Sequence, residues 1–403
     1  MIVNDKEEAH QFMSFNVKVL KMLNLWLDDG NLDELKWRSW KTYSIYIFLL
    51  PSLIPLFLEV IFVFTEPEAD IVIIFQVILA AVCVAGSMYM TVCFLSNRKT
   101  IKVIINSIGN FQKFTKISNT TNNNLIESDK KISFFSKAFM IYTILGMLIY
   151  VTAPTLNLSK CEKNKPFYMK NLGIPCGVIV RFRLPFRYDS WPVFHFYVIH
   201  QFLTAGMASL VIVNSTVLIS GLLRHAVIQL KQLKEDVLNI SENDKFIMKD
   251  KLKFCVKYHH EIINFIDDIN RAFGSQLVVY VTLTSLVISV LGFEILMEQD
   301  LFESMRYSMH LSGWFILLYT ICLNGQYVLD ESLEISAAAY NTNWYECPVE
   351  IQRDISLIMV RGQKPLTLNA LNLGNLSKIT FLKVLSSSYS YFTLFVNVKG
   401  RSR

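Results

Sequence analysis

The amino-acid sequence predicts an all-α membrane protein with seven transmembrane helices. Its 403 residues are 52% hydrophobic and only 18% charged, and the mean hydropathy is +0.36. Soluble domains usually carry about 25% charged residues, so a soluble enzyme and a disordered chain are both disfavoured. Seven segments are long and apolar enough to cross a hydrocarbon core of about 30 Å. They are Thr42–Phe64, Ile71–Leu95, Phe134–Thr155, Phe194–Leu223, Ala272–Leu296, Tyr307–Leu329 and Ile379–Val398.

Positive charge predicts the orientation of these spans. Most of the 39 Lys and Arg residues lie in alternate connections, which are residues 1–41, 96–133, 224–271 and 330–378. Connections rich in Lys and Arg stay in the cytosol, so we expect a cytosolic N-terminus and an extracellular C-terminus. The start of the chain also lacks the apolar core of a signal peptide. A G-protein-coupled receptor has the opposite orientation, and the sequence lacks Asp-Arg-Tyr after the third span and Asn-Pro-x-x-Tyr in the seventh.

The spans divide the chain into four regions. Residues 1–41 form a cytosolic segment with an in-plane amphipathic helix, because Phe12, Phe15, Val19, Met22 and Leu23 share one helical face. Residues 42–329 hold the first six spans and a ligand pocket. Residues 330–378 form a cytosolic anchor, to which helical extensions within 224–271 are added. Residues 379–403 form the seventh helix and a short outer tail.

No known catalytic pattern occurs in the sequence. It contains no phosphate-binding or dinucleotide-binding glycine motif, no nucleophile elbow and no H-E-x-x-H zinc motif. The 7 cysteines include no C-x-x-C pair, and His259 and His260 point about 100° apart on a helix, so we interpret them as a solvated pair. We therefore expect no enzyme activity, no cofactor, no metal site and no nucleic-acid partner.

Two further features, the charged residues within the spans and the cysteines of the outer loop, each have two possible interpretations. Glu59, Lys137, Glu294 and Lys383 lie near span ends, where we expect them to reach the membrane surface rather than to serve a proton path. In the outer loop at 156–193, Cys161 and Cys176 either form a disulfide or remain free thiols. Asn157-Leu158-Ser159 is a glycosylation sequon near the membrane.

The seventh span is unusually polar for a membrane helix. At helical spacing Ser387, Tyr391, Leu394 and Val398 share one face, with Ser390 and Asn397 beside it. Small hydroxyl residues favour close helix packing. The same face is also typical of a water-filled path in which an apolar ring at Leu394 gates by dewetting.

A concave wall is predicted on the third span. Thr143, Gly146 and Tyr150 fall on one helical face, and the small residue between a hydroxyl and an aromatic ring leaves room for a ligand. Ordinary core packing explains the same residues. The expected remaining walls of a pocket for a small volatile molecule are Phe75, Phe196, His200, Met207 and Trp314.

The C-terminal sequence resembles the signature of the insect odorant receptors. Residues 357–368 read L-I-M-V-R-G-Q-K-P-L-T-L, and residues 386–395 read S-S-S-Y-S-Y-F-T-L-F. The supporting residues are Arg361, Gln363, Lys364, Pro365, Phe381, Ser388, Tyr389, Ser390 and Tyr391, with Gly325, Ser332, Ala338, Tyr340 and Trp344 upstream. These motifs cover the last fifth of the chain, and the rest agrees in span number, orientation and loop size.

The resemblance implies a subunit of an odorant-gated, non-selective cation channel. Such a subunit joins a shared co-receptor in a heterotetramer in the plasma membrane, in the dendrites of olfactory neurons, and contacts membrane lipid. It implies a pore lined by the seventh helix, with Leu394 at the gate, and an odorant site on the face of Thr143, Gly146 and Tyr150.

Two other classes remain as alternatives. Gustatory receptors carry Thr-Tyr, five residues, then Gln-Phe, whereas this chain has Ser390, Tyr391, Asn397 and Val398, so only Tyr391 is kept. A seven-helix transporter would be expected to show related halves with broken helices, and the sequence shows no such repeat. The co-receptor itself is disfavoured because the 224–271 connection is too short for its insertion.

Overall fold

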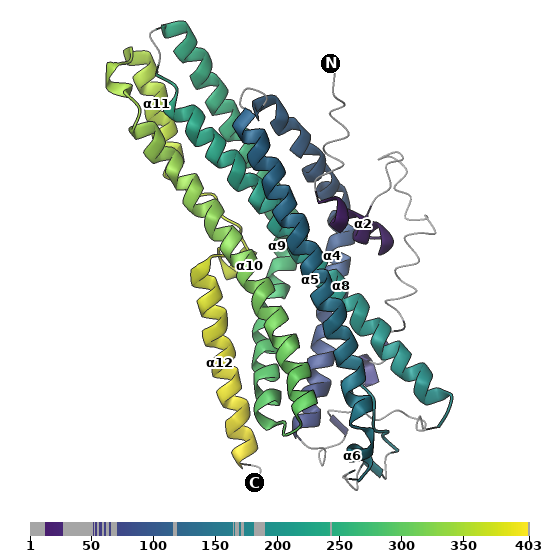
Figure 1. The fold of residues 1–403 in the computed structure, drawn as a ribbon. Helices are drawn as coiled ribbons and strands as arrows, with labels where there is room; N and C mark the ends of the chain where they lie inside the picture. The colour runs from purple at the N-terminus through teal and green to yellow at the C-terminus, as the bar shows by residue number, and fades with distance from the viewer. Residues whose placement is uncertain are drawn as a thin grey trace.

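The described part of the chain forms an elongated bundle of long helices (Figure 1). The computed structural model describes residues 13–26, 51, 53–54, 56–58, 60–61, 64–65, 71–115, 119–163, 165, 169–170, 173–180, 190–241 and 244–401. The principal helices are α4 (Ile71–Thr115), α5 (Asn119–Leu156), α8 (Val193–Leu238), α9 (Lys245–Met297), α10 (Leu301–Tyr340) and α12 (Lys378–Arg401). Shorter helices are α2 (Ser14–Met22), α6 (Leu158–Lys163), α11 (Val349–Gly362) and the 3-10 turns η1 (Trp344–Glu346) and η2 (Leu371–Leu373).

Capping aspartates fix where the two central helices begin. The Asp244 carboxylate accepts a hydrogen bond from the backbone N–H of Phe246 at 2.7 Å, and α9 then runs for 53 residues. Asp300 likewise accepts from the N–H groups of Phe302 and Glu303 and starts α10. An aspartate at this position satisfies N–H groups that have no partner within the helix. Only three residues separate α9 from α10, so the two helices run antiparallel.

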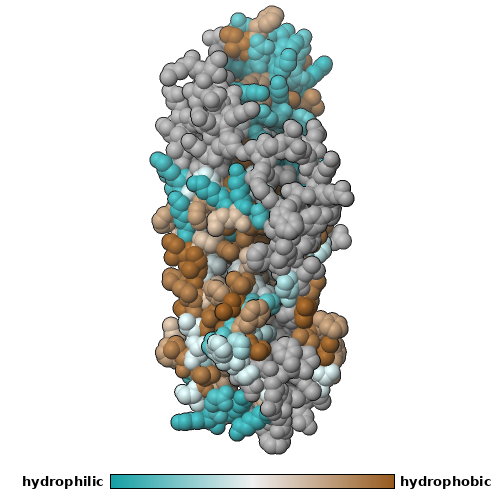
Figure 2. Space-filling view, turned by 90° about the vertical axis from the view of Figure 1, so that its right-hand side faces the viewer, coloured by the Kyte–Doolittle hydropathy of each residue, from teal (hydrophilic) through white to brown (hydrophobic). Residues whose placement is uncertain are grey.

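Five described helices are long and apolar enough to cross a membrane. They are α4, α5, α8, α9 and α12. Hydrophobic side chains gather in a band on the surface, with hydrophilic residues towards both ends (Figure 2). The fold class is thus the predicted all-helical membrane protein. The expected first span, Thr42–Phe64, lies partly outside the described residues, and those described between 51 and 65 are helical.

The sixth expected span, Tyr307–Leu329, lies within α10, which is not among these five helices. Three of its polar or aromatic residues, Tyr307, Trp314 and Asn324, are buried in the bundle. This face of α10 therefore contacts neighbouring helices rather than lipid.

The helices extend well past the apolar band at the α11 end, as the spacing within 224–271 predicts. A helix of 46 residues such as α8 is about 69 Å long, more than twice the thickness of a hydrocarbon core. In this region Tyr258 of α9 donates a hydrogen bond to Gln229 of α8 at 2.5 Å, and its ring stacks on Phe114 of α4 at 4.8 Å. α11 closes the region by burying Ile351, Ile355 and Ile358.

The docking face of α2 differs from the predicted apolar stripe. Met13, Asn16 and Leu20 are the buried residues, whereas Met22 is 82% exposed. The Asn16 amide donates to the Asn214 side-chain oxygen of α8 at 3.5 Å. Phe15, Val19 and Leu23 remain partly exposed, so the apolar stripe is not buried in the bundle, and its place in the membrane surface stays a prediction. Phe12 lies outside the described residues.

Two predictions about polar residues are wrong. Glu294 is 1% exposed and does not reach the surface, because α9 places it between other helices. His259 is buried as well, while His260 is exposed, so the adjacent histidines do point apart but only one is solvated. Lys137 and Lys383 are exposed, their reach to the membrane surface stays a prediction, and Glu59 lies outside the described residues.

Candidate functional site

A cavity lies among four helices in the apolar half of the bundle. α4, α5, α8 and α10 supply its walls, and residues 179–180 of the loop before α8 lie at its rim. Its volume is about 190 Å³, which suits a small organic molecule, and its walls are mostly apolar. Representative apolar wall residues are Leu79, Val84, Met147, Ile212, Met309 and Leu317.

The predicted face of α5 forms one wall of this cavity. Thr143, Gly146 and Tyr150 all line it, as their helical spacing requires. A Cβ built on Gly146 would find its nearest neighbour, the Met309 methyl, only at 4.0 Å. The Thr143 hydroxyl is already committed to the backbone carbonyl of Phe139 at 2.8 Å. The absence of a side chain at Gly146 therefore creates open space in the cavity. Thr143 contributes to the shape of the wall but offers no free hydrogen-bond donor to a ligand.

Two of the five remaining predicted wall residues lie at the cavity and three do not. His200 of α8 and Trp314 of α10 line it. Phe75 instead packs against Phe293 and Phe395, with ring centroids 5.0 and 4.4 Å away. Phe196 is 76% exposed. Met207 lies elsewhere on α8, outside the cavity. Helical spacing could not show these positions because each depends on how its helix is rotated against its neighbours.

α10 brings two polar residues to the cavity that the sequence analysis missed. Arg306 lines the wall about two turns before Trp314, and His310 lines it about one turn before. Their spacing of four residues from Arg306 to His310 and from His310 to Trp314 places all three on one helical face. This periodicity was the available signal, but Arg306 falls in the expected outer loop, where an arginine is ordinarily solvated.

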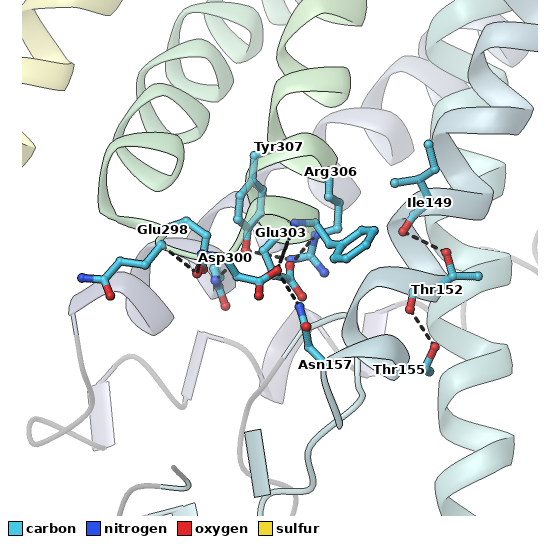
Figure 3. Close-up of polar contacts among 12 residues, drawn as sticks. Ile149, Thr152, Thr155, Asn157, Glu298, Asp300, Glu303, Arg306 and Tyr307 are labelled. Carbon is cyan, nitrogen blue, oxygen red and sulfur yellow. Dashed lines mark hydrogen bonds and ion pairs between the residues drawn. The ribbon is translucent and has the colours of Figure 1, made fainter. Parts of the chain in front are cut away.

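A compact ionic cluster holds Arg306 at the α6 end of the bundle (Figure 3). Its Nε lies 3.1 Å from a Glu303 carboxylate oxygen, and its Nη2 donates to the Tyr307 hydroxyl at 2.7 Å. Gln76 of α4 donates to the same hydroxyl at 2.8 Å. The guanidinium also lies 4.6 Å from the ring centroid of Tyr150. Ion pair, hydrogen bonds and a cation–π contact together fix the arginine in a buried position.

The loop at the α6 end is tied to the start of α10. Asp300 accepts hydrogen bonds from the Asn157 amide and from Lys160, each at 2.9 Å. These contacts lower the pKa of the Asp300 carboxyl to about 2, with Lys160 the larger cause. The structure joins Cys161 and Cys176 in a disulfide, which links α6 to the segment at 173–180 beside the cavity rim.

The polar face of α12 points away from the bundle. Ser387, Ser390, Tyr391, Leu394, Asn397 and Val398 are all exposed. The opposite face packs on α9 and α10, where Ser388 and Val384 are buried. The residues predicted to line a pore therefore share one exposed surface, which no other described helix of this chain covers.

Comparison with known proteins identifies the family. The family model described as "7tm Odorant receptor" matches residues 70–389. Odorant receptor 85f of Drosophila melanogaster is 28% identical over 165 residues, which is 41% of each chain. Odorant receptor 85b of the same species is 31% identical over 139 residues, 34% of this chain and 36% of that protein. Odorant receptor Or2 of Anopheles gambiae is 23% identical over 268 residues, 64% of this chain and 70% of that protein.

The fold also matches a solved receptor. The structure of the insect olfactory receptor OR5 from Machilis hrabei aligns with a TM-score of 0.81, and its complex with eugenol with 0.80. Both alignments cover 98% of this chain and 100% of that chain at 14% identity. The family match, which spans most of the chain, agrees with the expected receptor class and with the expectation that the protein is not an enzyme. The chain belongs to the seven-transmembrane odorant receptor family.

Proposed function

We propose that the chain is the odorant-specific subunit of a ligand-gated, non-selective cation channel. A small volatile molecule binds the cavity between α4, α5, α8 and α10. The observation that carries the proposal is the pairing of this mostly apolar cavity with a separate polar face on α12. One feature suits the ligand and the other suits an ion path.

Aromatic contacts link α4, which supplies part of the cavity wall, to the helix of the proposed pore. Phe75 of α4 contacts Phe395 of α12, and Phe293 of α9 contacts both rings. A ligand that shifts α4 would move α12 through these contacts, because packed interiors transmit displacement. The channel opens when Leu394 is drawn away from the ion path.

The pore needs several copies of α12, since one helix cannot enclose water. The chain therefore joins further subunits, and the family resemblance names a co-receptor in a heterotetramer in the plasma membrane. The α11 region, with Leu357 and Val360 each 66% exposed, supplies an apolar surface for that contact. The N-terminus and the α11 region lie in the cytosol, as the distribution of Lys and Arg indicates.

Whole-cell current on co-expression with an insect co-receptor tests this function. We expect a panel of volatiles to evoke a cation current that persists under G-protein blockade. Tyr150→Ala should change the ranking of ligands, because its ring lines the cavity. A current abolished by G-protein blockade, or no ligand-evoked current from a chain shown at the cell surface, contradicts the proposal.

A further inference from the structure

One end of the cavity is polar, whereas most of its wall is apolar. Tyr150 of α5 and Arg306 and His310 of α10 meet there. The Arg306 guanidinium lies 4.6 Å from the Tyr150 ring centroid, and the Tyr150 and His310 rings are 5.5 Å apart in an edge-on arrangement. Three hydrogen-bonding side chains from two helices thus form one patch, which we call the polar end.

The donors at the polar end are only partly used. Arg306 is 4% exposed and carries five N–H donors. Its Nη2 donates to Tyr307 and its Nε faces Glu303, whereas its Nη1 meets no acceptor among the described residues. The Tyr150 hydroxyl likewise makes no hydrogen bond within the described part of the chain. Both side chains line the cavity, so an acceptor bound there would give each of these groups a hydrogen-bond partner.

His310 is held in its neutral form at the polar end. The indole N–H of Trp314 can only donate, and it donates to His310 Nε2 at 3.0 Å. That nitrogen must then be unprotonated, so the imidazole is neutral and carries its hydrogen on Nδ1. Nδ1 is buried and has no acceptor among the described residues. The neutral His310 ring therefore adds no charge at the polar end, and Arg306 and Tyr150 are the side chains that offer donors to a ligand.

The charge balance decides which acceptor fits. Arg306 is already neutralised by Glu303 at 3.1 Å, and the buried Glu294 lies within electrostatic range of the same guanidinium. A carboxylate ligand would add a further negative charge to this group. A carbonyl or ester oxygen accepts hydrogen bonds without adding charge, and the apolar wall covers its hydrocarbon part.

We propose that the cavity selects neutral volatiles that carry a carbonyl or ester oxygen, with that oxygen held by Arg306 and Tyr150 at the polar end. The inference rests on the proposed function, because it assigns a ligand class to the same cavity. It distinguishes this chain from a receptor whose cavity recognises ligands by shape alone.

Binding is tested with the purified full-length chain in lipid nanodiscs. The thermal unfolding midpoint is titrated with a linear methyl ketone, the carboxylic acid and the alkane of equal length, which gives an apparent affinity for each. A hydrogen bond to a charged donor corresponds to roughly ten-fold in affinity. We expect the ketone to bind about ten-fold more tightly than the alkane, and the acid to bind more weakly than the ketone.

Variants then locate the effect. Tyr150→Phe, and Glu303→Gln combined with Arg306→Gln, should remove most of the ketone preference. The double change removes both members of the Glu303–Arg306 ion pair together, and the milder Tyr150→Phe keeps the test open if the double variant does not fold. Thr152→Val is the matched control on α5, because its hydroxyl bonds the Leu148 carbonyl outside the cavity; it should keep the preference.

The outcomes separate the two proposals. Equal affinity for ketone and alkane, or tighter binding of the acid, would overturn the inference while the ligand-binding function stands. A ketone preference that survives Tyr150→Phe and the double variant also overturns it. Failure of every compound to bind would remove the cavity as a ligand site and the proposed function with it.

Discussion

The side-chain oxygens of Ser388 on α12 and Ser285 on α9 lie 3.3 Å apart, and both residues are buried. This contact joins the helix of the proposed pore to the bundle that holds the cavity. Because this contact lies on the buried side of α12, away from the exposed Leu394 face, we expect it to hold α12 in the closed-channel position.

Removing this contact should favour opening. Ser388→Ala deletes one hydroxyl of the pair, and a buried hydrogen bond is worth about 1 kcal/mol, or roughly five-fold in an equilibrium. We expect the odorant concentration for half-maximal current to fall by about that factor. Ser386→Ala, the same change at an exposed site on α12, serves as control; equal responses from the two variants would contradict the assignment.

Leu394→Ala should produce current without ligand. Leu394 is 54% exposed on the free face of α12, where an apolar ring excludes water from a narrow pore. A smaller side chain admits water and ions at rest. Leu382→Ala is the comparison, since Leu382 is 64% exposed about 120° away on the same helix. Ligand-free current in the Leu382 variant alone would place the gate elsewhere.

Asp300→Asn should lower the unfolding midpoint slightly at neutral pH through loss of the Lys160 ion pair. Asparagine still caps α10, so capping is retained. The folded-state pKa of Asp300 is lowered to about 2. Its ionised carboxylate therefore stabilises the folded protein fully at pH values above about 4, the ordinary aspartate pKa, and this stabilisation is lost as the pH falls to about 2. The difference between the two proteins, measured as an unfolding midpoint, should therefore shrink over that range.

A second helix cap provides the control for Asp300. Asp244 caps α9 through the N–H of Phe246, and no cation contacts it among the described residues. Asp244→Asn should leave the unfolding midpoint nearly unchanged, because asparagine and aspartate cap helices about equally well. A loss as large as that of Asp300→Asn would show that capping, rather than the tie to Lys160, sets the effect.

Alkylation should distinguish the cysteines of the disulfide from the rest. The structure pairs Cys161 with Cys176 and leaves five of the 7 cysteines free. In denatured, unreduced protein we expect five alkylated sites by mass, and seven after reduction. The bond closes a separation of 15 residues, for which a loop-entropy estimate is about 3 kcal/mol. Seven sites before reduction would refute the pairing.

Two glycines should respond in opposite ways to the same substitution. Gly146→Ala places a methyl group in open cavity volume, so the fold should be kept or slightly stabilised, while bulky ligands lose affinity before small ones. Gly325→Ala would drive a methyl group against the backbone carbonyl of Leu376, and should lower the unfolding midpoint. Matched titrations and melts of the two variants check this; tolerance of alanine at Gly325 would contradict the packing.

The predicted helices follow from local properties of the chain. Apolar segments of sufficient length produce helices, and helical periodicity alone places Thr143, Gly146 and Tyr150 on one face. The same reasoning puts Ser387, Tyr391, Leu394 and Val398 together on α12. These predictions hold because a residue's position around its own helix depends only on its number in the sequence.

Tertiary packing decided the rest. The rotation of each helix against its neighbours excludes Phe75, Phe196 and Met207 from the cavity, and it turns Arg306 and His310 inwards. Glu294 is buried although it lies near a span end, and α2 docks through Asn16 rather than Met22. Rotation and burial depend on contacts between segments that are distant in sequence, such as Asn16 with Asn214, and the periodicity of one segment contains no information about its partner.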